Sequence, residues 1–444
     1  MLNKIQSAIE SLDKLSKNKP IKIISHYDTD GITSAAIFSK AMNRWNKKFS
    51  LQIVKSLEED FIKSLPDSHI LIFLDLASNS LDYLAKKQTE VFILDHHEIT
   101  QEIPKNVTII NPHLENHEQI CGAAVSYLFA KALSSENKDL ATLAVIGMVG
   151  DTHEKNIGKA YDEIIKDSET TVRKGILIYP STRPIDKALE YSSSPYIPGV
   201  TGSFKGVLEL LREANIKPEN GKNKALYALS EAEMSSLITS IMLRSGGKIN
   251  PEELIGNLFL VKFLNKLEDA RELSALINAC SRMDHPHLAL GFCLGNEEFK
   301  QQAEKIYIGH KRNIVSALKY VSEMEKISGN KYTIINAKDN IKDTIIGTVA
   351  SIISHSATYE KGTIIIALAY NQDKIKVSAR MVGREGRNVR EVLSKVVLPL
   401  GGEVGGHPNA AGCLIEKEHE ESFLKELQKN LDIEFIQPAQ SEDL

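Results

Sequence analysis

The chain has 444 residues, of which 42% are hydrophobic and 25% are charged, a composition typical of a globular protein with two or three domains. Its formal net charge of −4 argues against a protein that coats long duplex DNA, so any polyanion must bind in a local groove. Four well-separated cysteines argue against a disulfide framework, and no uncharged apolar run is long enough to cross a membrane. We therefore expect a soluble cytoplasmic protein, whose first 19 residues form an amphipathic helix rather than a signal peptide.

Short apolar runs alternate with helical patterns in the first third of the chain. The runs are continuous and rich in β-branched residues, as in strands that are buried on both faces of a parallel sheet. They comprise residues 21–25, 70–75, 91–95 and 107–111. Helical periodicity is clearest at residues 33–45 and 123–135. The alternation predicts a doubly wound, mostly parallel α/β domain over residues 1–200.

The middle of the chain, residues 201–328, carries helical periodicity without strand patterns. The expected helices comprise residues 204–214, 231–243, 251–264, 269–283 and a long charged helix near 297–326. Gly, Pro and Asn separate them, as is common between helices. The pattern predicts an all-helical connecting region.

Strand patterns return in residues 329–436. The expected strands comprise residues 332–337, 362–370 and 374–382, with a helix at 343–354 between the first two. Asn388 and Glu391 have the spacing of a capping box at the start of another helix. A glycine-rich segment, GGEVGGHPNAAG, follows at 401–412. These patterns predict a second, smaller α/β domain.

Acidic and imidazole side chains follow the apolar runs of the first domain. They comprise His26, Asp28, Asp30, Asp75, Asp95, His96, His97 and Asp151. Because ligands of open α/β sheets bind beyond the carboxyl ends of the strands, four strand ends are expected to aim these side chains at one crevice. Each residue alone has an ordinary explanation, such as an Asx turn or a helix cap. The set together indicates a functional site.

Carboxylates crowded into one crevice need positive charge among them. Four aspartates would repel one another and raise one another's pKa values, whereas divalent cations would hold them ionised. Carboxylates and imidazoles without thiolates suit Mn²⁺ or Mg²⁺ better than structural Zn²⁺. One shared Asp could bridge two ions roughly 3.5–4 Å apart, as in hydrolases that activate water for in-line phosphoryl displacement. The sequence therefore predicts a site for two divalent ions.

The motifs, in this order, resemble those of a known family. The segment SHYDTDG, the Asp of FLDLAS, LDHH and GMVGD resemble the four motifs of the DHH phosphoesterases. GGEVGGHPNAAG resembles the GGH motif of the C-terminal domain associated with that family. Residues 182–202 and 278–295 are similar to stretches of archaeal RecJ-like exonucleases, the GINS-associated nuclease group. The resemblance covers nearly the whole chain.

The resemblance implies a role for each residue of the motifs. Asp28 would ligate the first metal with His26 as a helper, and Asp75 would bridge the two ions. The second ion would be held by Asp30, His96 and Asp151. His97 would face the scissile phosphate, so that His97, Asp30 and Asp75 are the expected catalytic residues. In many relatives the first histidine lies four residues before the first Asp, whereas His26 lies two before Asp28.

The C-terminal domain is expected to hold the substrate. In the family, the Ser-x-Arg that matches Ser378 and Arg380 binds phosphate, which suits a planar guanidinium. The glycine-rich segment would add Gly405 and Gly406, where backbone can approach a ligand, and His407. Arg282 and Arg183 are further candidates for the wall of an inter-domain cleft. Single-stranded nucleic acid fits such a cleft because its backbone can be threaded through it.

The function expected from this resemblance is a metal-dependent exonuclease, acting 5′ to 3′ on single-stranded DNA and also on RNA, in DNA replication and repair. Some relatives attack RNA from the 3′ end. One alternative is a phosphodiesterase that cleaves dinucleotides or cyclic dinucleotides, since the same motifs serve that chemistry. Another is a non-catalytic scaffold at the replication fork, where relatives bind GINS and the replicative helicase. No membrane partner is expected.

Overall fold

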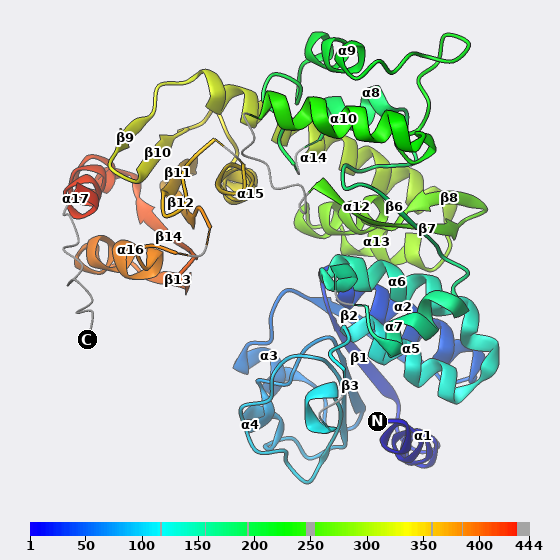
Figure 1. Cartoon of the computed structure of the whole chain (residues 1–444). Coiled ribbons are helices and arrows are strands. Elements are labelled where there is room, and N and C mark those ends of the chain that lie inside the picture. Colours follow the sequence, from blue (N-terminus) through cyan, green and yellow to red (C-terminus); the bar gives the residue numbers. More distant parts are fainter. Residues whose placement is uncertain are drawn as a thin grey trace, which may run out of the picture. The chain divides into compact units, whose positions relative to one another are not determined.

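The computed structural model describes residues 1–115, 118–155, 157–192, 195–245, 254–356, 358–383 and 385–432 (Figure 1). The chain forms two compact units. Unit 1 comprises Met1–Arg183, Ala225–Ala228 and Ile255–His310, and unit 2 comprises Pro184–Lys224, Leu229–Leu254 and Lys311–Leu444. The division at residues 200 and 328 stays a prediction.

The main sheet of unit 1 has five parallel strands in the order β2-β1-β3-β4-β5. They are β1 (Ile21–His26), β2 (Phe49–Val54), β3 (Ile70–Leu74), β4 (Val91–Leu94) and β5 (Val107–Ile110). The four predicted strands are confirmed. The edge strand β2 was not predicted. Its residues mostly alternate between half-buried and exposed, so it lacks the continuous apolar run that marks the central strands.

Helices cover both faces of this sheet. They are α1 (Leu2–Leu15), α2 (Thr29–Arg44), α3 (Glu59–Ser64), α4 (Leu81–Leu84), α5 (Gly122–Leu133), α6 (Ala141–Gly150) and α7 (Lys159–Asp167). Ile70 and Ile72 share a core with α2 and α5, whereas Leu71 and Phe73 share the opposite core with α3 and α4 (Figure 1). Successive residues of one strand thus pack on opposite faces, which confirms the doubly wound α/β fold.

The expectation that strands are absent from the middle of the chain is wrong. Strands β7 (Ile255–Phe263) and β8 (Lys266–Asp269) lie there and form an antiparallel sheet with β6 (Thr171–Ile176), a strand of the first 200 residues that was also not predicted. The segment 251–264 was expected to be helical, but its described part is mostly β7. A short apolar run fits either structure, and the decisive feature is the turn at Leu264 and Asn265, where both φ angles are positive (46° and 61°) as in a two-residue hairpin.

The remaining predicted helices of the middle region are confirmed. They are α9 (Phe204–Glu213), α10 (Glu231–Arg244), α12 (Ala270–Arg282) and α14 (Glu297–Glu323), accompanied by α8 (Ile185–Glu190) and α13 (Pro286–Cys293). Helices α12 and α13 share the core of α2 and α6 in unit 1. Among the described helices, none has both the length and the apolar composition that crossing a bilayer requires.

The sheet of unit 2 has the order β13-β14-β12-β11-β10-β9 and is antiparallel except where β10 pairs with β11. Its strands are β9 (Ile327–Gly329), β10 (Tyr332–Asn336), β11 (Ile364–Asn371), β12 (Lys374–Met381), β13 (Val404–His407) and β14 (Ala410–Glu416). The glycine-rich segment 401–412 thus contributes to a hairpin, β13-β14, that was not predicted.

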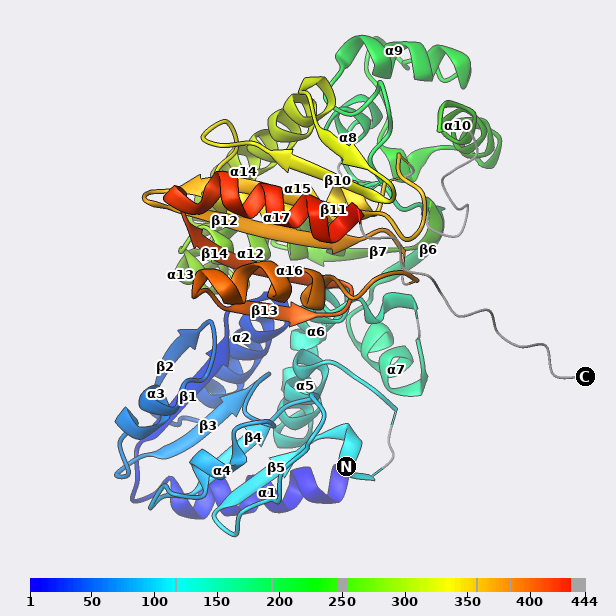
Figure 2. The ribbon, with the colours of Figure 1, turned by 90° about the vertical axis from the view of Figure 1, so that its left-hand side faces the viewer.

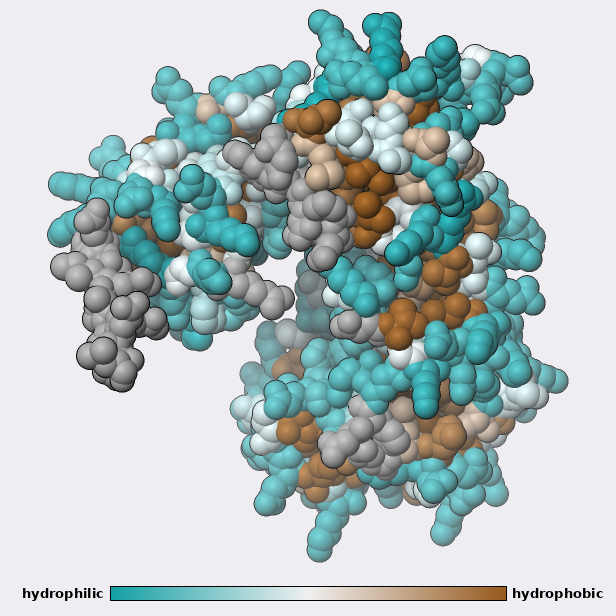
Figure 3. All heavy atoms as spheres, viewed as in Figure 1, coloured by the Kyte–Doolittle hydropathy of each residue, from teal (hydrophilic) through white to brown (hydrophobic). Residues whose placement is uncertain are grey.

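Helices cover the two faces of this second sheet as well. Helix α15 (Asp343–Ser354) packs with Ile365 and Ala367, and α16 (Val389–Val397) and α17 (Glu420–Asp432) pack on the other face (Figure 2). Asn388 caps α16, as expected, by accepting from the N–H groups of Arg390 and Glu391. Its amide also donates to the Glu391 carboxylate. On the face seen in Figure 3, hydrophilic side chains cover most of each unit, in keeping with these buried apolar cores.

Candidate metal centre

The first motif lies where β1 passes into α2. Asp28 is the N-cap of α2, and its Oδ1 accepts from the Gly31 N–H at 3.0 Å. Asp30 follows in the first turn of the helix and is buried. His26 ends β1, with its Nδ1 3.1 Å from Oδ2 of Asp28 and 3.5 Å from Oδ2 of Asp75. Asp28 therefore does cap a helix, and this cap fixes its carboxylate beside His26 and Asp75.

Asp30 is held by the start of α5. Its two oxygens accept from the backbone N–H groups of Gly122 at 2.6 Å and Ala123 at 2.8 Å. The first N–H groups of a helix have no partner within the helix, so a carboxylate there is well placed. Even so, burial and then the nearby Asp75 carboxylate raise the pKa of Asp30 well above its ordinary value. The two N–H groups and the nearby His96 therefore do not offset the burial of this carboxylate and its repulsion by Asp75.

Asp75 is the second buried carboxylate of the site. It follows β3 with a positive φ of 57°, is 2% exposed, and neither of its oxygens has a hydrogen-bond partner among the described residues. Burial, together with the charges of Asp28 and Asp95, raises its pKa to about 7, although His26 acts in the opposite direction. A buried carboxylate without donors is costly, so this geometry fits a group that binds a cation.

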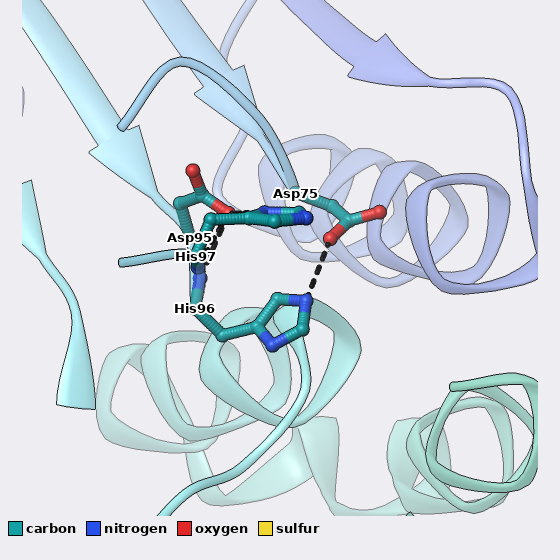
Figure 4. Close-up of side chains that lie close together, drawn as sticks. All are labelled: Asp75, Asp95, His96 and His97. Carbon is teal, nitrogen blue, oxygen red and sulfur yellow. Dashed lines mark hydrogen bonds and ion pairs between the residues drawn. The ribbon is translucent and has the colours of Figure 1, made fainter. Parts of the chain in front are cut away.

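His96 joins the acids from different segments. Its Nε2 lies 3.3 Å from Oδ1 of Asp75 (Figure 4). The same atom lies 3.7 Å from Oδ2 of Asp30 and 3.6 Å from Oδ2 of Asp151. Asp151 was expected at a strand end, and this is wrong, because it is the C-cap of α6. The apolar run before it resembles a buried strand because α6 is hydrophobic on all sides and almost wholly buried.

His97 belongs to a separate pair with Asp95. Its Nδ1 donates to Oδ1 of the buried Asp95 at 2.7 Å, and its side chain is 50% exposed (Figure 4). This hydrogen bond raises the pKa of His97 to about 9. Although burial opposes it, the same bond and those from Ser78 lower the pKa of Asp95 to about 2. Asp95, to which the sequence assigned no role, therefore orients the exposed imidazole.

This pair predicts a pH-dependent contribution to the stability of the metal-free protein. The raised pKa of His97 means that its contribution is present below the ordinary value of 6.5 and is lost as the pH rises through about 9. The lowered pKa of Asp95 means that its contribution is present above 3.8 and is lost as the pH falls through about 2.

In EDTA, Asp95→Asn is expected to lower the free energy of unfolding by about 1–2 kcal/mol near pH 6, since His97 is half exposed and solvent screens the pair. The difference from wild type should shrink by about pH 9.5. Urea unfolding at both pH values measures it. A difference that grows with pH would contradict this account of the pair.

The predicted substrate-binding residues Ser378 and Arg380 lie on β12 in unit 2. In the sheet register, Ser378 of β12 pairs with Gly412 of β14, which in turn pairs with Gly405 of β13. In the same way, Arg380 pairs with Ala410, which pairs with His407. Paired residues of antiparallel strands point to the same face. Ser378, Arg380, Gly405 and His407 therefore share one face, on which α15 lies near enough that a Cβ on Gly347 would be 3.0 Å from Ser378 Oγ.

Arg380 is half-buried, and its Nη1 donates to the backbone carbonyls of Ala379 and Ala411. Burial lowers its pKa, and no carboxylate of the described residues pairs with it. Gly406 has a φ of 118° and leaves no room for a side chain, whereas a Cβ on Gly405 would meet nothing within 4 Å. Of the two glycines, Gly406 is therefore required by the hairpin itself.

Two further arginines were candidates for substrate binding in unit 1. Arg282 is exposed in the last turn of α12, one turn after Asn278, whose side chain accepts from the Thr29 N–H. It thus lies on the face of α12 that meets the first motif. Arg183 instead lies 3.4 Å from Glu272 and 3.8 Å from Glu268, so carboxylates already surround it.

The family domains that match this chain follow one another in the same order as the motifs described above. Residues 20–148 match the DHH family, N-terminal domain, and residues 329–432 match the DHHA1 domain. The chain belongs to the DHH family. Residues 178–258 of this DHH protein also match the DHH-CID domain.

Relatives of this DHH protein match either nearly all of the chain or a part of it. An uncharacterized protein of Methanocaldococcus jannaschii is 28% identical over 450 residues, covering 96% of this chain and 97% of its own. The single-stranded-DNA-specific exonuclease RecJ of Bacillus subtilis is 26% identical over 161 residues, which are 32% of this chain and 20% of that protein.

Two solved structures share the fold. Exonuclease RecJ bound to manganese has a TM-score of 0.61 at 16% identity, covering 97% of this chain and 95% of that one. CDC45 from Entamoeba histolytica has a TM-score of 0.69 at 13% identity, covering 97% and 99%.

Gly122 is one of the glycines whose size the site constrains. A Cβ there would lie 2.8 Å from Cβ of Asp75 and 3.0 Å from Oδ2 of Asp30. We expect Gly122→Ala to destabilise the protein by about 1–3 kcal/mol, because the two carboxylates must move. The control is Gly309→Ala in α14, where a Cβ would meet no atom within 4 Å and should stabilise by about 0.5–1 kcal/mol. Thermal unfolding measures both, and equal effects would contradict this account.

Proposed function

We propose that the protein is a metal-dependent nuclease that hydrolyses phosphodiester bonds, acting as a 5′ to 3′ exonuclease on single-stranded DNA and also on RNA, in DNA replication or repair. The observation that carries the proposal is Asp75, a buried carboxylate that accepts no hydrogen bond from any described residue and lies among other carboxylates and two imidazoles. Membership of the DHH family and the fold of RecJ support the same reaction class.

The described residues fit two divalent ions. His26, Asp28 and Asp75 offer ligand atoms within 4.8 Å of one another, and His96 and Asp151 belong to a second such group. In the proposed site His26, Asp28 and Asp75 would hold the first ion, and Asp30, His96, Asp151 and Asp75 would hold the second. All are oxygen or imidazole ligands, which suits Mn²⁺ or Mg²⁺. When bound, such ions lower the pKa of a water and stabilise the charge of the phosphoryl group.

His97 is the proposed group that contacts the reacting phosphate. Asp95 fixes its Nδ1 and favours the protonated ring, so Nε2 can donate a hydrogen bond to a phosphate oxygen or to the leaving oxygen. An imidazole whose position is fixed in this way stabilises charge without having to reorganise during the reaction.

In unit 2, Ser378 and Arg380 are proposed to bind a substrate phosphate. A half-buried guanidinium without a carboxylate partner among the described residues can accept an anion at little cost, and its planar fork suits bidentate contact with phosphate. Gly405 leaves open space beside them, and His407 lies on the same face.

Arg380→Lys is expected to raise the KM for a single-stranded oligonucleotide by about tenfold, because loss of a bidentate contact costs about 1.4 kcal/mol, while kcat changes little. The control is Arg390→Lys, an exposed residue of α16. Steady-state kinetics with a labelled 20-mer measure both. Equal effects of the two variants, or a fall in kcat alone, would contradict phosphate binding by Arg380.

Digestion of end-labelled oligonucleotides with Mn²⁺ tests the proposed activity. We expect release of mononucleotides from the 5′ end, and comparison of DNA with RNA and of 20-mers with dinucleotides and cyclic dinucleotides ranks the substrates. Preference for dinucleotides would favour the alternative phosphodiesterase. No release of nucleotides from either end would refute the nuclease proposal.

A scaffold that binds GINS and the replicative helicase is a second candidate, for which the CDC45 fold is the relevant observation. The complete set of acids favours an enzyme, and both roles can coexist in one chain. A pull-down of purified GINS by the wild-type chain and by Asp30→Ala separates them. Retained binding by the variant would support an independent scaffold role, whereas absence of binding by the wild-type chain would exclude it.

A further inference from the structure

The first three backbone N–H groups at the start of α5 are all bound by side chains of the site. Those of Gly122 and Ala123 donate to Asp30. That of Cys121, the N-cap, donates to the hydroxyl oxygen of Tyr161 at 2.8 Å. Asp30 is thus held directly by α5, while Tyr161 connects the same helix end to a second part of the centre.

The side chain of His153 connects Tyr161 to Asp151. The hydroxyl of Tyr161 lies 2.9 Å from Nδ1 of His153, and Nε2 of His153 lies 3.0 Å from Oδ2 of Asp151. Tyr161 comes from α7 and is fully buried, and burial raises its pKa, so the hydroxyl keeps its proton. His153 is half-buried, in a short 3-10 turn directly after Asp151.

The proton on His153 follows from its neighbours. If the Tyr161 hydroxyl donates to Nδ1, the ring proton lies on Nε2 and faces the Asp151 carboxylate. The opposite tautomer would turn the Nε2 lone pair towards a carboxylate oxygen, which is repulsive. Both ring nitrogens of His153 are then occupied by protein groups, so His153 does not supply a metal ligand, although it lies within ligand distance of His96 and Asp151.

We infer that His153 and Tyr161 form a positioning pair, in which Tyr161 fixes the His153 ring and His153 orients the Asp151 carboxylate for metal binding. The inference rests on the proposed metal centre. Side chains that hold a metal ligand in this way typically contribute 10–100-fold to metal affinity. No role was expected for either residue from the sequence, where the only signal was a histidine two residues after Asp151.

Calorimetric titration of the full chain with Mn²⁺ tests the pair by a readout other than activity. We expect two ions per wild-type chain. His153→Ala and Tyr161→Phe should each retain two ions but weaken one of them by about 10–100-fold. The matched control is Tyr127→Phe, which removes another hydroxyl of a buried tyrosine, this one on α5 itself, that donates to Asp167 instead. Its Mn²⁺ affinity should equal that of wild type.

Two further variants separate positioning from ligation. His153→Gln can place an amide N–H near the position of Nε2 and should recover part of the lost affinity. Since Tyr161 acts through His153, adding Tyr161→Phe to His153→Ala should weaken binding no further.

Wild-type affinity in both single variants would overturn the pair while leaving the proposed function intact. Loss of one ion in His153→Ala together with an unaffected Tyr161→Phe would also overturn it, because His153 would then be a ligand. Absence of Mn²⁺ binding by the wild-type chain would overturn both the pair and the proposed function.

Discussion

Asp75→Asn is expected to abolish nuclease activity and, at the same time, to stabilise the metal-free protein. Asn keeps the shape of the side chain and tolerates the φ of 57° at this position, so the backbone need not change. It removes a buried negative charge that has no hydrogen-bond partner among the described residues, and its amide can donate to the neighbouring carboxylates. We expect unfolding in EDTA to cost about 1–2 kcal/mol more than in wild type.

Activity should fall by at least about a thousandfold, since a loss of about 4 kcal/mol of transition-state stabilisation corresponds to that factor. The control is Asp284→Asn, which also has a positive φ, of 62°, but is exposed and pairs with Lys55. Its free energy of unfolding should equal that of wild type. An Asp75→Asn protein that is less stable than wild type in EDTA, or that remains active, would contradict the account of this carboxylate.

His97→Gln is expected to lower kcat by about 10²–10⁴-fold while both ions still bind. The reason is that Nδ1 of His97 is bound to Asp95, so the ring is arranged to contact substrate rather than metal. Asp95→Asn should lower kcat less, and the double variant should be no worse than His97→Gln, because Asp95 acts through His97. Asp95→Asn should also move the alkaline limb of the pH profile of kcat to lower pH, since Asp95 raises the pKa of His97.

Single-turnover kinetics and Mn²⁺ titration of the same preparations measure these effects. The control is His355→Gln, an exposed histidine of unit 2 whose Nδ1 contacts the Ser351 carbonyl. It should behave as wild type. Loss of an ion in His97→Gln would show that His97 is a ligand and would contradict its assigned place at the phosphate.

The elements that were predicted well from the sequence are those whose burial is compatible with only one pattern of apolar residues. The central strands β1, β3 and β4 are buried on both faces, so their apolar runs are continuous and were expected. The edge strand β5 was expected too, because three of its four residues are buried. The same rule failed for α6, which is also buried on all sides and therefore resembles a strand. It failed again for β7, whose hairpin turn has no glycine to reveal it.

The sequence indicated which residues gather at the candidate site, but not the hydrogen bonds and ion pairs that connect them. Repulsion among acids pointed to cations without any knowledge of contacts. The groups that hold those acids include distant segments that carry no motif: the N–H groups of Gly122 and Ala123 bind Asp30, and Tyr161 contacts His153 beside Asp151. The role of Asp95 was hidden as well, because only the structure shows that it binds His97 rather than joining the other aspartates.

Crystals grown in MnCl₂ and measured near the manganese absorption edge test the central claim most directly. The claim is that the acids of the DHH domain lie close together because paired cations lie between them. We predict two anomalous peaks on either side of Asp75, one beside Asp28 and the other beside Asp30, His96 and Asp151. Absence of both peaks, with those side chains in place, would contradict it.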